Sequence, residues 1–292
     1  MTRRFALLVN PVSAGGRPLR VLPDVLAELE RAGAEHRVVE TRSLEHALEE
    51  ASVVAEAGEA VMTLGGDGLV GPVAGVLRGA EAPLAVIPAG RGNDFARMLG
   101  LPEEPAAAAR ATIEGVERRV DVPAVDGKPF VGIASLGFDS DANRIANQAR
   151  LVRGNLVYLY AALRALAAWT PAAFSVRIDG ELHRITGYSV AVGNSRYYGG
   201  GMLVLPDAEL DDGLLDVLLV SKHSKLRALR NLANVFRGEH FDPPFMRIVR
   251  GKVVEVDADR PFAVYADGDH IGDTPATVTV EPNSLRVLVP AP

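Results

Sequence analysis

The stretch Leu64-Gly65-Gly66-Asp67-Gly68 decides how the rest of this chain is interpreted. It follows directly on the apolar run 60–64, a pattern typical of a buried strand that ends in a tight loop. Glycine allows backbone angles that place several N–H groups on one concave side, and it lets a ligand approach the chain closely. The loop is therefore suited to hold phosphate, and Asp67 is its one side chain with chemistry to offer.

Two more glycine loops follow apolar runs in the same way. They are Asn10-Pro11-Val12-Ser13-Ala14-Gly15-Gly16 after the run 5–9, and Pro88-Ala89-Gly90-Arg91-Gly92-Asn93-Asp94 after the run 84–87. Strands that alternate with helices indicate a doubly wound parallel sheet, whose ligands bind at the carboxyl ends of the strands. All three loops fall at that edge. The expected helices are 18–32, 43–57, 70–78 and 94–99, with a further strand at 36–40.

The pattern changes near residues 118–122, after which short strands and turn dipeptides such as Asp126-Gly127 predominate. This change predicts an α/β domain at 1–122 and an antiparallel β-rich domain at 123–292, with a cleft between them. The last residues, about 283–292, can return to the first domain. The expected strands are 130–136, 174–178, 185–193, 214–220, 252–258, 262–266 and 277–280, with helices inserted at 155–169 and 224–236.

Composition excludes several classes of protein. The 292 residues are 48% hydrophobic and 23% charged, which suits a folded, soluble protein with sizeable cores. No apolar run approaches the roughly twenty residues that span a bilayer, and the N-terminus lacks the features of a signal peptide. The absence of cysteine excludes disulfides and thiolate nucleophiles and fits a cytoplasmic protein. A net charge of −6 argues against a nucleic-acid binder.

Five motifs in order resemble the diacylglycerol kinase catalytic family, which includes bacterial lipid kinases and the sphingosine kinases. NAD kinases and phosphofructokinases share its Gly-Gly-Asp-Gly loop more distantly. The motifs cover nearly the whole chain, and their order makes the resemblance far more specific than one glycine loop would. They are Asn10-Pro11 with Gly15-Gly16, then 65–68, 88–97, Asn194-Ser195-Arg196-Tyr197-Tyr198-Gly199-Gly200-Gly201, and 206–216.

The resemblance implies an ATP-dependent lipid kinase that transfers the γ-phosphate to a lipid hydroxyl, most of all that of diacylglycerol. It implies that Asp67 acts through Mg²⁺, and that Asp269, in the stretch Ala266-Asp267-Gly268-Asp269, is the general base. It also implies a structural Mg²⁺ held by the backbone carbonyls of Glu209 and Leu214 and the carboxylate of Asp212. The nucleotide-binding residues that it implies are Asn10, Pro11, Ser13, Thr41, Gly65, Gly66, Asp67, Gly68, Gly90, Arg91, Asn93 and Asp94.

The chain departs from the family pattern at Leu69-Val70-Gly71-Pro72, where the family usually has Thr, a small apolar residue, Asn and Glu. Asp269 also stands where the family has glutamate. Two alternatives therefore stay open: a kinase for a soluble acceptor such as NAD, and a protein that binds nucleotide or lipid without turnover. The residues allow plainer roles too, because Asp67 can satisfy loop amides and Asp267-Gly268 is typical of a hairpin turn.

The segment 222–237 combines leucines with five lysines or arginines at helical spacing. Such a helix can lie on an anionic membrane, or it can pack its apolar stripe inside and leave its cations in water. The apolar stripe of the expected helix at 155–169 is more typical of core. We expect ATP and a lipid at a membrane surface as partners, no nucleic acid, and leave a homodimer and peripheral contact with the inner membrane face open.

Overall fold

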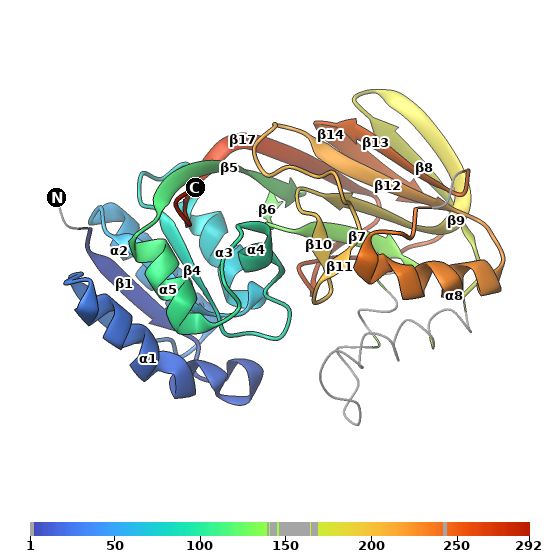
Figure 1. The fold of residues 1–292 in the computed structure, drawn as a ribbon. Coiled ribbons are helices and arrows are strands. Elements are labelled where there is room, and N and C mark those ends of the chain that lie inside the picture. Colours follow the sequence, from blue (N-terminus) through green and yellow to red (C-terminus); the bar gives the residue numbers. More distant parts are fainter. Residues whose placement is uncertain (1–2, 139, 141–144, 146–163, 165–168, 242–243) are drawn as a thin grey trace. The chain divides into compact units, whose positions relative to one another are not determined.

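The structure is a computed structural model that describes residues 3–138, 140, 145, 164, 169–241 and 244–292 (Figure 1). The chain divides into two compact units. Unit 1 consists of Met1–Val122 with Pro282–Pro292, and unit 2 consists of Pro123–Glu281. The helix expected at 155–169 lies almost wholly outside the described residues.

Unit 1 is built on a parallel sheet with the strand order β2-β1-β3-β4. The C-terminal end of the chain adds to it, because Val287 pairs in parallel with Leu84. The order reverses between β1 and β3, and ligands of doubly wound sheets bind beside such a reversal. The strands are β1 (Phe5–Val9), β2 (His36–Glu40), β3 (Ala60–Gly65) and β4 (Leu84–Pro88), with β17 (Ala276–Val289) beside β4.

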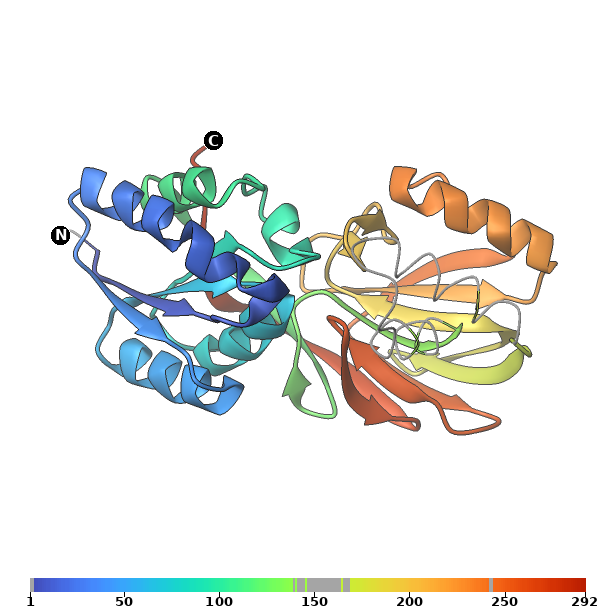
Figure 2. The same ribbon diagram turned by 90° about the horizontal axis from the view of Figure 1, so that it is seen from below.

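Helices cover both faces of this sheet (Figure 2). Phe5, Leu7 and Val9 share one face of β1 and pack with Val25 and Leu29 in the core on that side. Fully burying a side chain of this size contributes about 1.5–3 kcal/mol. Helices α1 and α5 pack together on that face, and α2 packs against α3. The helices are α1 (Arg17–Arg31), α2 (Leu44–Glu56), α3 (Asp67–Leu77), α4 (Asp94–Met98) and α5 (Pro105–Ile113), with a short 3-10 turn η1 (Ser13–Gly15).

The helix ends of unit 1 differ in detail from the predictions. The start expected for the helix at 43–57 agrees with α2, because Ser43 is its N-cap and accepts a hydrogen bond from the His46 N–H. Helix α3 begins three residues before the predicted start, because Gly66 is extended and serves as its N-cap. Helix α5 was not predicted, since its alanines give no apolar periodicity. The pair Glu104-Pro105 is the sequence signal for the start of α5. The Glu104 carboxylate accepts hydrogen bonds from the N–H groups of Ala106 and Ala107, and proline is favoured in the first turn of a helix.

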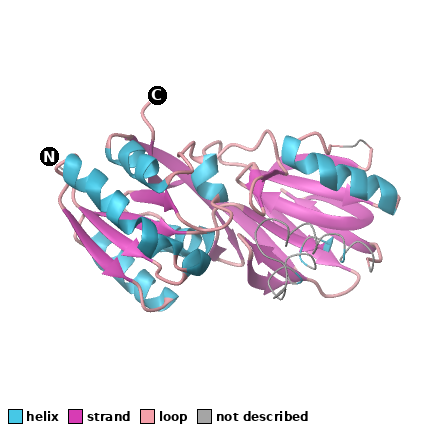
Figure 3. Ribbon diagram, turned by 60° about the horizontal axis from the view of Figure 1, so that its bottom comes forward, coloured by secondary structure: helices cyan, strands magenta, loops and turns pink. Residues whose placement is uncertain are grey.

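Unit 2 is an antiparallel β structure (Figure 3), as predicted. Its long central strand β9 pairs with β7, β8 and β12. Strand β12 also pairs with β13, and β14 lies between β8 and β17. The strands are β7 (Ile133–Gly137), β8 (Ala172–Ile178), β9 (Glu181–Gly193), β12 (Leu215–Ser221), β13 (Met246–Gly251), β14 (Val253–Ala258), β15 (Ala263–Ala266) and β16 (Asp269–Asp273).

Smaller elements complete the fold. Strand β5 (Val116–Val125) pairs with β17 and with β6 (Lys128–Pro129). Strands β10 (Tyr197–Tyr198) and β11 (Met202–Leu203) form a separate two-stranded sheet. Helix α8 (Lys225–Asn234) is followed by a 3-10 turn η2 (Val235–Arg237). No helix in the described part of the chain is long and apolar enough to cross a bilayer.

Among the longer strands of unit 2, β13 and β16 were not predicted, and neither were the two-residue strands β6, β10 and β11. Strand β7 begins at Ile133, although a start at Phe130 was predicted. The later start of β7 follows from the hydrogen bonds of the residues before it. The N–H groups of Val131 and Gly132 donate to the carboxylate of Asp267, so they do not serve a neighbouring strand.

Candidate functional site

The second and third glycine loops meet at the carboxyl edge of the unit 1 sheet. A Cβ placed on Gly90 would lie 2.4 Å from the Gly66 Cα, and one on Gly66 would lie 2.9 Å from the Gly90 Cα. The Gly65 carbonyl also accepts a hydrogen bond from the Ala89 N–H at 2.7 Å. Only glycine fits at both positions, and the backbone of the two loops is left bare of side chains there.

Asn93 fixes the shape of the third loop. Its Oδ1 accepts a hydrogen bond from the Gly90 N–H at 2.8 Å, and its Nδ2 donates to the Gly90 carbonyl at 3.3 Å. Asn93 has φ +53°, in the left-handed region where asparagine is better tolerated than most residues. The Arg17 guanidinium, from α1, donates to the same Gly90 carbonyl at 3.4 Å. Gly90 and Asn93, both predicted to bind nucleotide, are thus joined by hydrogen bonds within one turn.

Asp67 connects the second loop to the start of α4. It is the first residue of α3, and its Oδ1 accepts a hydrogen bond from the Phe95 N–H at 3.3 Å. Burial raises the pKa of the Asp67 carboxyl, and the backbone N–H groups of Phe95 and Asp94 oppose that rise. The side chain therefore satisfies loop amides, as the plainer interpretation expected, although the amides belong to the neighbouring loop.

The first glycine loop lies beside the second. The Asn10 N–H donates to the Leu64 carbonyl at 3.2 Å, and the Ser13 Oγ would be 3.8 Å from a Cβ on Gly66. Thr41 is buried, and its hydroxyl donates to the Val9 carbonyl at 3.0 Å, so it supports the strand end that leads into this loop. Pro11 belongs to the first glycine loop as well. Unit 1 therefore gathers residues from all three loops at one edge of its sheet.

The charged residues of the third loop have different surroundings. Arg91 is exposed at the loop's tip. The Asp94 carboxylate accepts a hydrogen bond from Arg97 at 2.8 Å, which occupies one of its oxygens. Gly68 is exposed in the first turn of α3, whereas Leu69 is buried against Gly65. The departure from the family pattern at Leu69 therefore adds to the apolar core beneath the loop.

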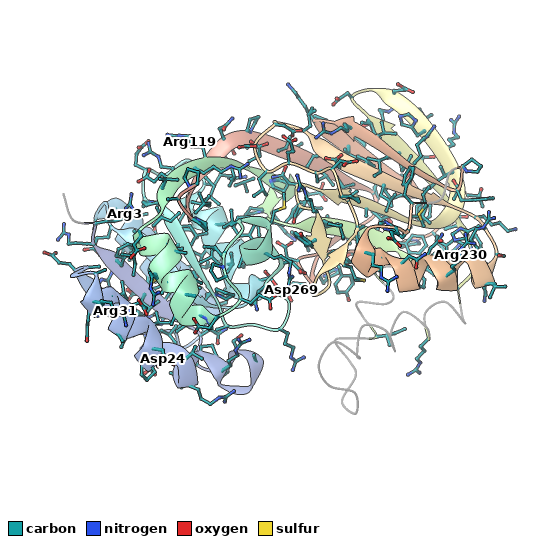
Figure 4. The ribbon with its side chains drawn as sticks, in the orientation of Figure 1. Arg3, Asp24, Arg31, Arg119, Arg230 and Asp269 are labelled. Atoms are coloured by element: carbon teal, nitrogen blue, oxygen red, sulfur yellow. The ribbon has the colours of Figure 1, made fainter. Side chains whose placement is uncertain are left out.

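In unit 2, Asp269 is the first residue of β16 and follows the turn from β15 (Figure 4). The predicted hairpin turn is present, because Ala266 pairs with Asp269 and both Asp267 and Gly268 have positive φ. Asp269 is exposed, yet the protein around its carboxyl removes enough water to raise its pKa. The neighbouring His270 is exposed and lies 3.2 Å from Asp273 Oδ1. A carboxylate on a tight turn with a raised pKa is suited to accept a proton.

The turn that carries Asp269 is anchored by Asp267. Its Oδ2 accepts from the Val131 N–H at 2.8 Å, and its Oδ1 accepts from the Gly132 N–H at 2.9 Å. A side chain at Gly132 would collide with this carboxylate, because a Cβ there would lie 2.4 Å from Oδ1. Sequence reasoning did not assign this role to Asp267. The Asp-Gly dipeptide indicated a turn but not the two N–H groups, before the start of β7, that hold the aspartate.

The predicted ligands of a structural Mg²⁺ lie on the loop before β12. The Asp212 Oδ1 accepts from the Leu214 N–H at 3.0 Å, and its Oδ2 accepts from Arg250. Glu209 is exposed. Among the residues that the structure describes, no three His, Asp or Glu side chains form a cluster suited to a metal ion. The Asp212 carboxylate therefore already accepts from two groups of the protein, and the assignment of Mg²⁺ to the backbone carbonyls of Glu209 and Leu214 and the carboxylate of Asp212 stays a prediction.

Comparison with known proteins covers both units. Residues 4–125 match the family described as the diacylglycerol kinase catalytic domain, and residues 132–289 match the YegS C-terminal NAD kinase beta sandwich-like domain. A diacylglycerol kinase of Mycobacterium tuberculosis is 36% identical over 98% of this chain and 95% of its own length. A probable lipid kinase, YegS-like, of Pseudomonas aeruginosa is 35% identical over 78% of this chain and 75% of its own length.

The fold is also found among solved structures. A crystal structure of a diacylglycerol kinase from Bacillus anthracis covers 98% of this chain and 97% of its own, with a TM-score of 0.78 and 21% identity. At that identity the likeness supports the fold alone. The two matched domains and the relatives above show that the chain belongs to the diacylglycerol kinase family of lipid kinases.

Proposed function

We propose that this protein transfers the γ-phosphate of ATP to the hydroxyl of a lipid, with diacylglycerol as the first candidate acceptor. One observation carries the proposal: the Gly66 and Gly90 loops touch backbone to backbone at the edge where such sheets bind ligands. Loops with no side chain between their backbones are suited to phosphate. The names of the relatives support the choice of a lipid as acceptor.

We assign the phosphates of ATP to the three loops of unit 1, with Arg91 as an exposed cation beside them. Asp67 is our candidate for the carboxylate that acts on the Mg²⁺ accompanying ATP, because magnesium prefers oxygen ligands. The bound ion would supply positive charge to the β- and γ-phosphates. The residues of the chain supply shape: Asn93 holds the loop closed, and the Phe95 N–H fixes the Asp67 carboxylate.

We assign the general base to Asp269. In the transfer, the lipid hydroxyl oxygen forms a bond to the γ-phosphorus, the bond from that phosphorus to the bridging oxygen breaks, and ADP leaves. The Asp269 carboxylate accepts the proton that the hydroxyl loses. Its raised pKa makes it a stronger base than an ordinary aspartate, and Asp267 holds its turn in place.

The acceptor requires access to a membrane surface, and helix α8 is the candidate for peripheral contact. Residues 217–238 contain five lysines or arginines and no aspartate or glutamate, although the whole chain carries a net charge of −6. Lys225 and Arg230 are exposed, and the Leu226 side chain is 78% exposed between them. A basic helix with an exposed leucine fits an anionic lipid surface. A cytoplasmic location and a homodimer stay predictions.

The experiment that tests the proposed function is phosphoryl transfer from labelled ATP with Mg²⁺. The acceptors are diacylglycerol, monoacylglycerol, ceramide or sphingosine in mixed micelles, with NAD as the soluble alternative. We expect a labelled phospholipid from diacylglycerol and none in the Asp67→Asn protein. Transfer to NAD alone would favour the soluble acceptor, and nucleotide binding without transfer to any acceptor would refute the kinase.

Membrane contact has its own measurement. Sedimentation with vesicles of phosphatidylcholine, with or without phosphatidylglycerol, should show binding to the anionic vesicles that salt weakens. Lys225→Glu with Arg230→Glu should abolish it. Arg184→Glu, an exposed arginine on β9, is the matched control and should leave binding intact. Binding by the Lys225→Glu, Arg230→Glu protein equal to that of the Arg184→Glu control would contradict the role of α8.

A further inference from the structure

One arginine of unit 2 joins two acidic side chains on neighbouring elements. Asp216 on β12 and Arg250 on β13 are directly opposite in the antiparallel register. The Arg250 Nε lies 3.2 Å from the Asp216 Oδ1, and its Nη2 lies 3.4 Å from the Asp216 Oδ2. The same Nη2 donates to the Asp212 Oδ2. A single guanidinium therefore binds both carboxylates, one on the strand and one on the loop before it.

The two carboxylates need a positive charge in this position. The Asp216 side chain is 4% exposed and that of Asp212 is 19% exposed, so neither is well hydrated. Arg250 is the cation that both carboxylates contact. Removing one partner of a buried ion pair leaves the other as an uncompensated buried charge, which is strongly destabilising.

The guanidinium competes with a metal ion for the Asp212 carboxylate. The Asp212 Oδ1 accepts from the Leu214 N–H and its Oδ2 accepts from Arg250, so both oxygens already have a donor. A divalent cation at this carboxylate would lie close to the Arg250 guanidinium, and the repulsion between the two positive charges opposes its binding unless Arg250 also leaves the buried Asp216. Arg250 and a metal are thus alternatives for the same acidic pair.

We propose that Arg250 takes, in this chain, the place of the divalent cation that the family resemblance assigns to the 209–214 loop, so that unit 2 keeps its fold without Mg²⁺. The arginine is covalently part of the chain and directly opposite its partner, so the loop is held at every Mg²⁺ concentration. This inference concerns the stability of unit 2 and does not depend on the proposed function.

Thermal melting of the full chain without nucleotide tests this, in MgCl₂ and in EDTA. An ion bound at a hundred times its dissociation constant would raise Tm by about 5–10 °C. We expect the Tm of the parent protein to differ by less than about 1 °C between the two conditions. A clear rise of Tm in MgCl₂ that Asp212→Asn abolishes would overturn the proposal, and this comparison does not require an arginine variant to fold.

Variants of β13 give the second test. Arg250→Gln should lower Tm by several degrees, and MgCl₂ should partly restore it because the two carboxylates then lack a cation. Arg247→Gln is the matched control: Arg247 is on the same strand and contacts His183 at 3.1 Å, away from the acidic pair. Its Tm should not respond to MgCl₂. An Arg250→Gln protein that is as stable as the control, or that ignores MgCl₂, would overturn the proposal.

Discussion

Gly90→Ala tests the contact between the glycine loops. The new methyl carbon would lie 2.4 Å from the Gly66 Cα and 2.9 Å from the Asn93 Oδ1, whereas carbon atoms pack at about 3.5–4.0 Å. The Gly66 neighbour is backbone, so no side chain can turn away, and the loops must separate by roughly 1 Å. The methyl carbon also crowds the Asn93 Oδ1, the atom that accepts the 2.8 Å hydrogen bond from the Gly90 N–H.

The expected cost follows from that displacement. Overpacking of this kind costs about 1–3 kcal/mol, which lowers Tm by about 3–9 °C in a chain of this size. Nucleotide affinity should fall about tenfold or more, which corresponds to about 1.4 kcal/mol. A misplacement near 1 Å can also lower the rate of transfer about a hundredfold. Calorimetric titration with a non-hydrolysable ATP analogue measures the affinity, and thermal melting measures the stability.

Gly58→Ala is the matched control. It adds the same methyl group where no atom lies within 4 Å, but at φ +69°, a conformation that costs alanine about 1–2 kcal/mol. This protein should lose stability and keep its affinity for nucleotide. If Gly90→Ala binds nucleotide as tightly as the parent, or if Gly58→Ala loses affinity equally, the assignment of phosphate to the Gly66 and Gly90 loops is refuted.

Two further predictions concern carboxylates. Asp267→Asn removes the charge from the acceptor of the two N–H groups at 131–132. Hydrogen bonds to charged groups contribute about 1.5–3 kcal/mol, so the turn that carries Asp269 should be held less firmly, and kcat should fall about tenfold while nucleotide affinity is unchanged. A loss of affinity with normal kcat would contradict the positioning role. Hydrogen bonds from Arg110 and Arg31 lower the pKa of the buried Glu28 from 4.5 to about 2. The stability that the ionised Glu28 carboxylate provides is therefore complete above pH 4.5 and is lost as pH falls toward 2. The Tm difference between the parent and Glu28→Gln should shrink as pH falls from about 5 to 3, and a constant difference would show that the ion pair is not responsible.

The sequence predicted the elements whose causes are local. Apolar runs marked β1, β3 and β4, glycines marked the loops after them, and Ser43 marked the start of α2. The position of the loops at the carboxyl edge followed from the alternation of strands and helices alone. That part of the candidate site, the gathering of the three loops within unit 1, therefore required no tertiary information.

The remaining features depend on contacts between distant residues. The hydrogen bond from the Phe95 N–H to Asp67 joins residues 28 positions apart, and no periodicity signals it. Arg250 meets Asp216 through the register of two strands, and the second of them, β13, was not predicted. The anchoring of Asp267 shortened β7, because the N–H groups of Val131 and Gly132 serve a side chain. Such pairings are fixed by packing, which one sequence does not display.

The central claim is that this protein is a kinase whose base is Asp269. The most direct measurement compares the transfer of labelled phosphate from ATP to diacylglycerol by the parent, Asp269→Asn and Asp273→Asn. The last is a matched control at the other end of β16. We expect Asp269→Asn to lose transfer by a hundredfold or more, within the range of about 10²–10⁴ for general bases, while binding an ATP analogue normally. Transfer by Asp269→Asn at the rate of the control would contradict the account.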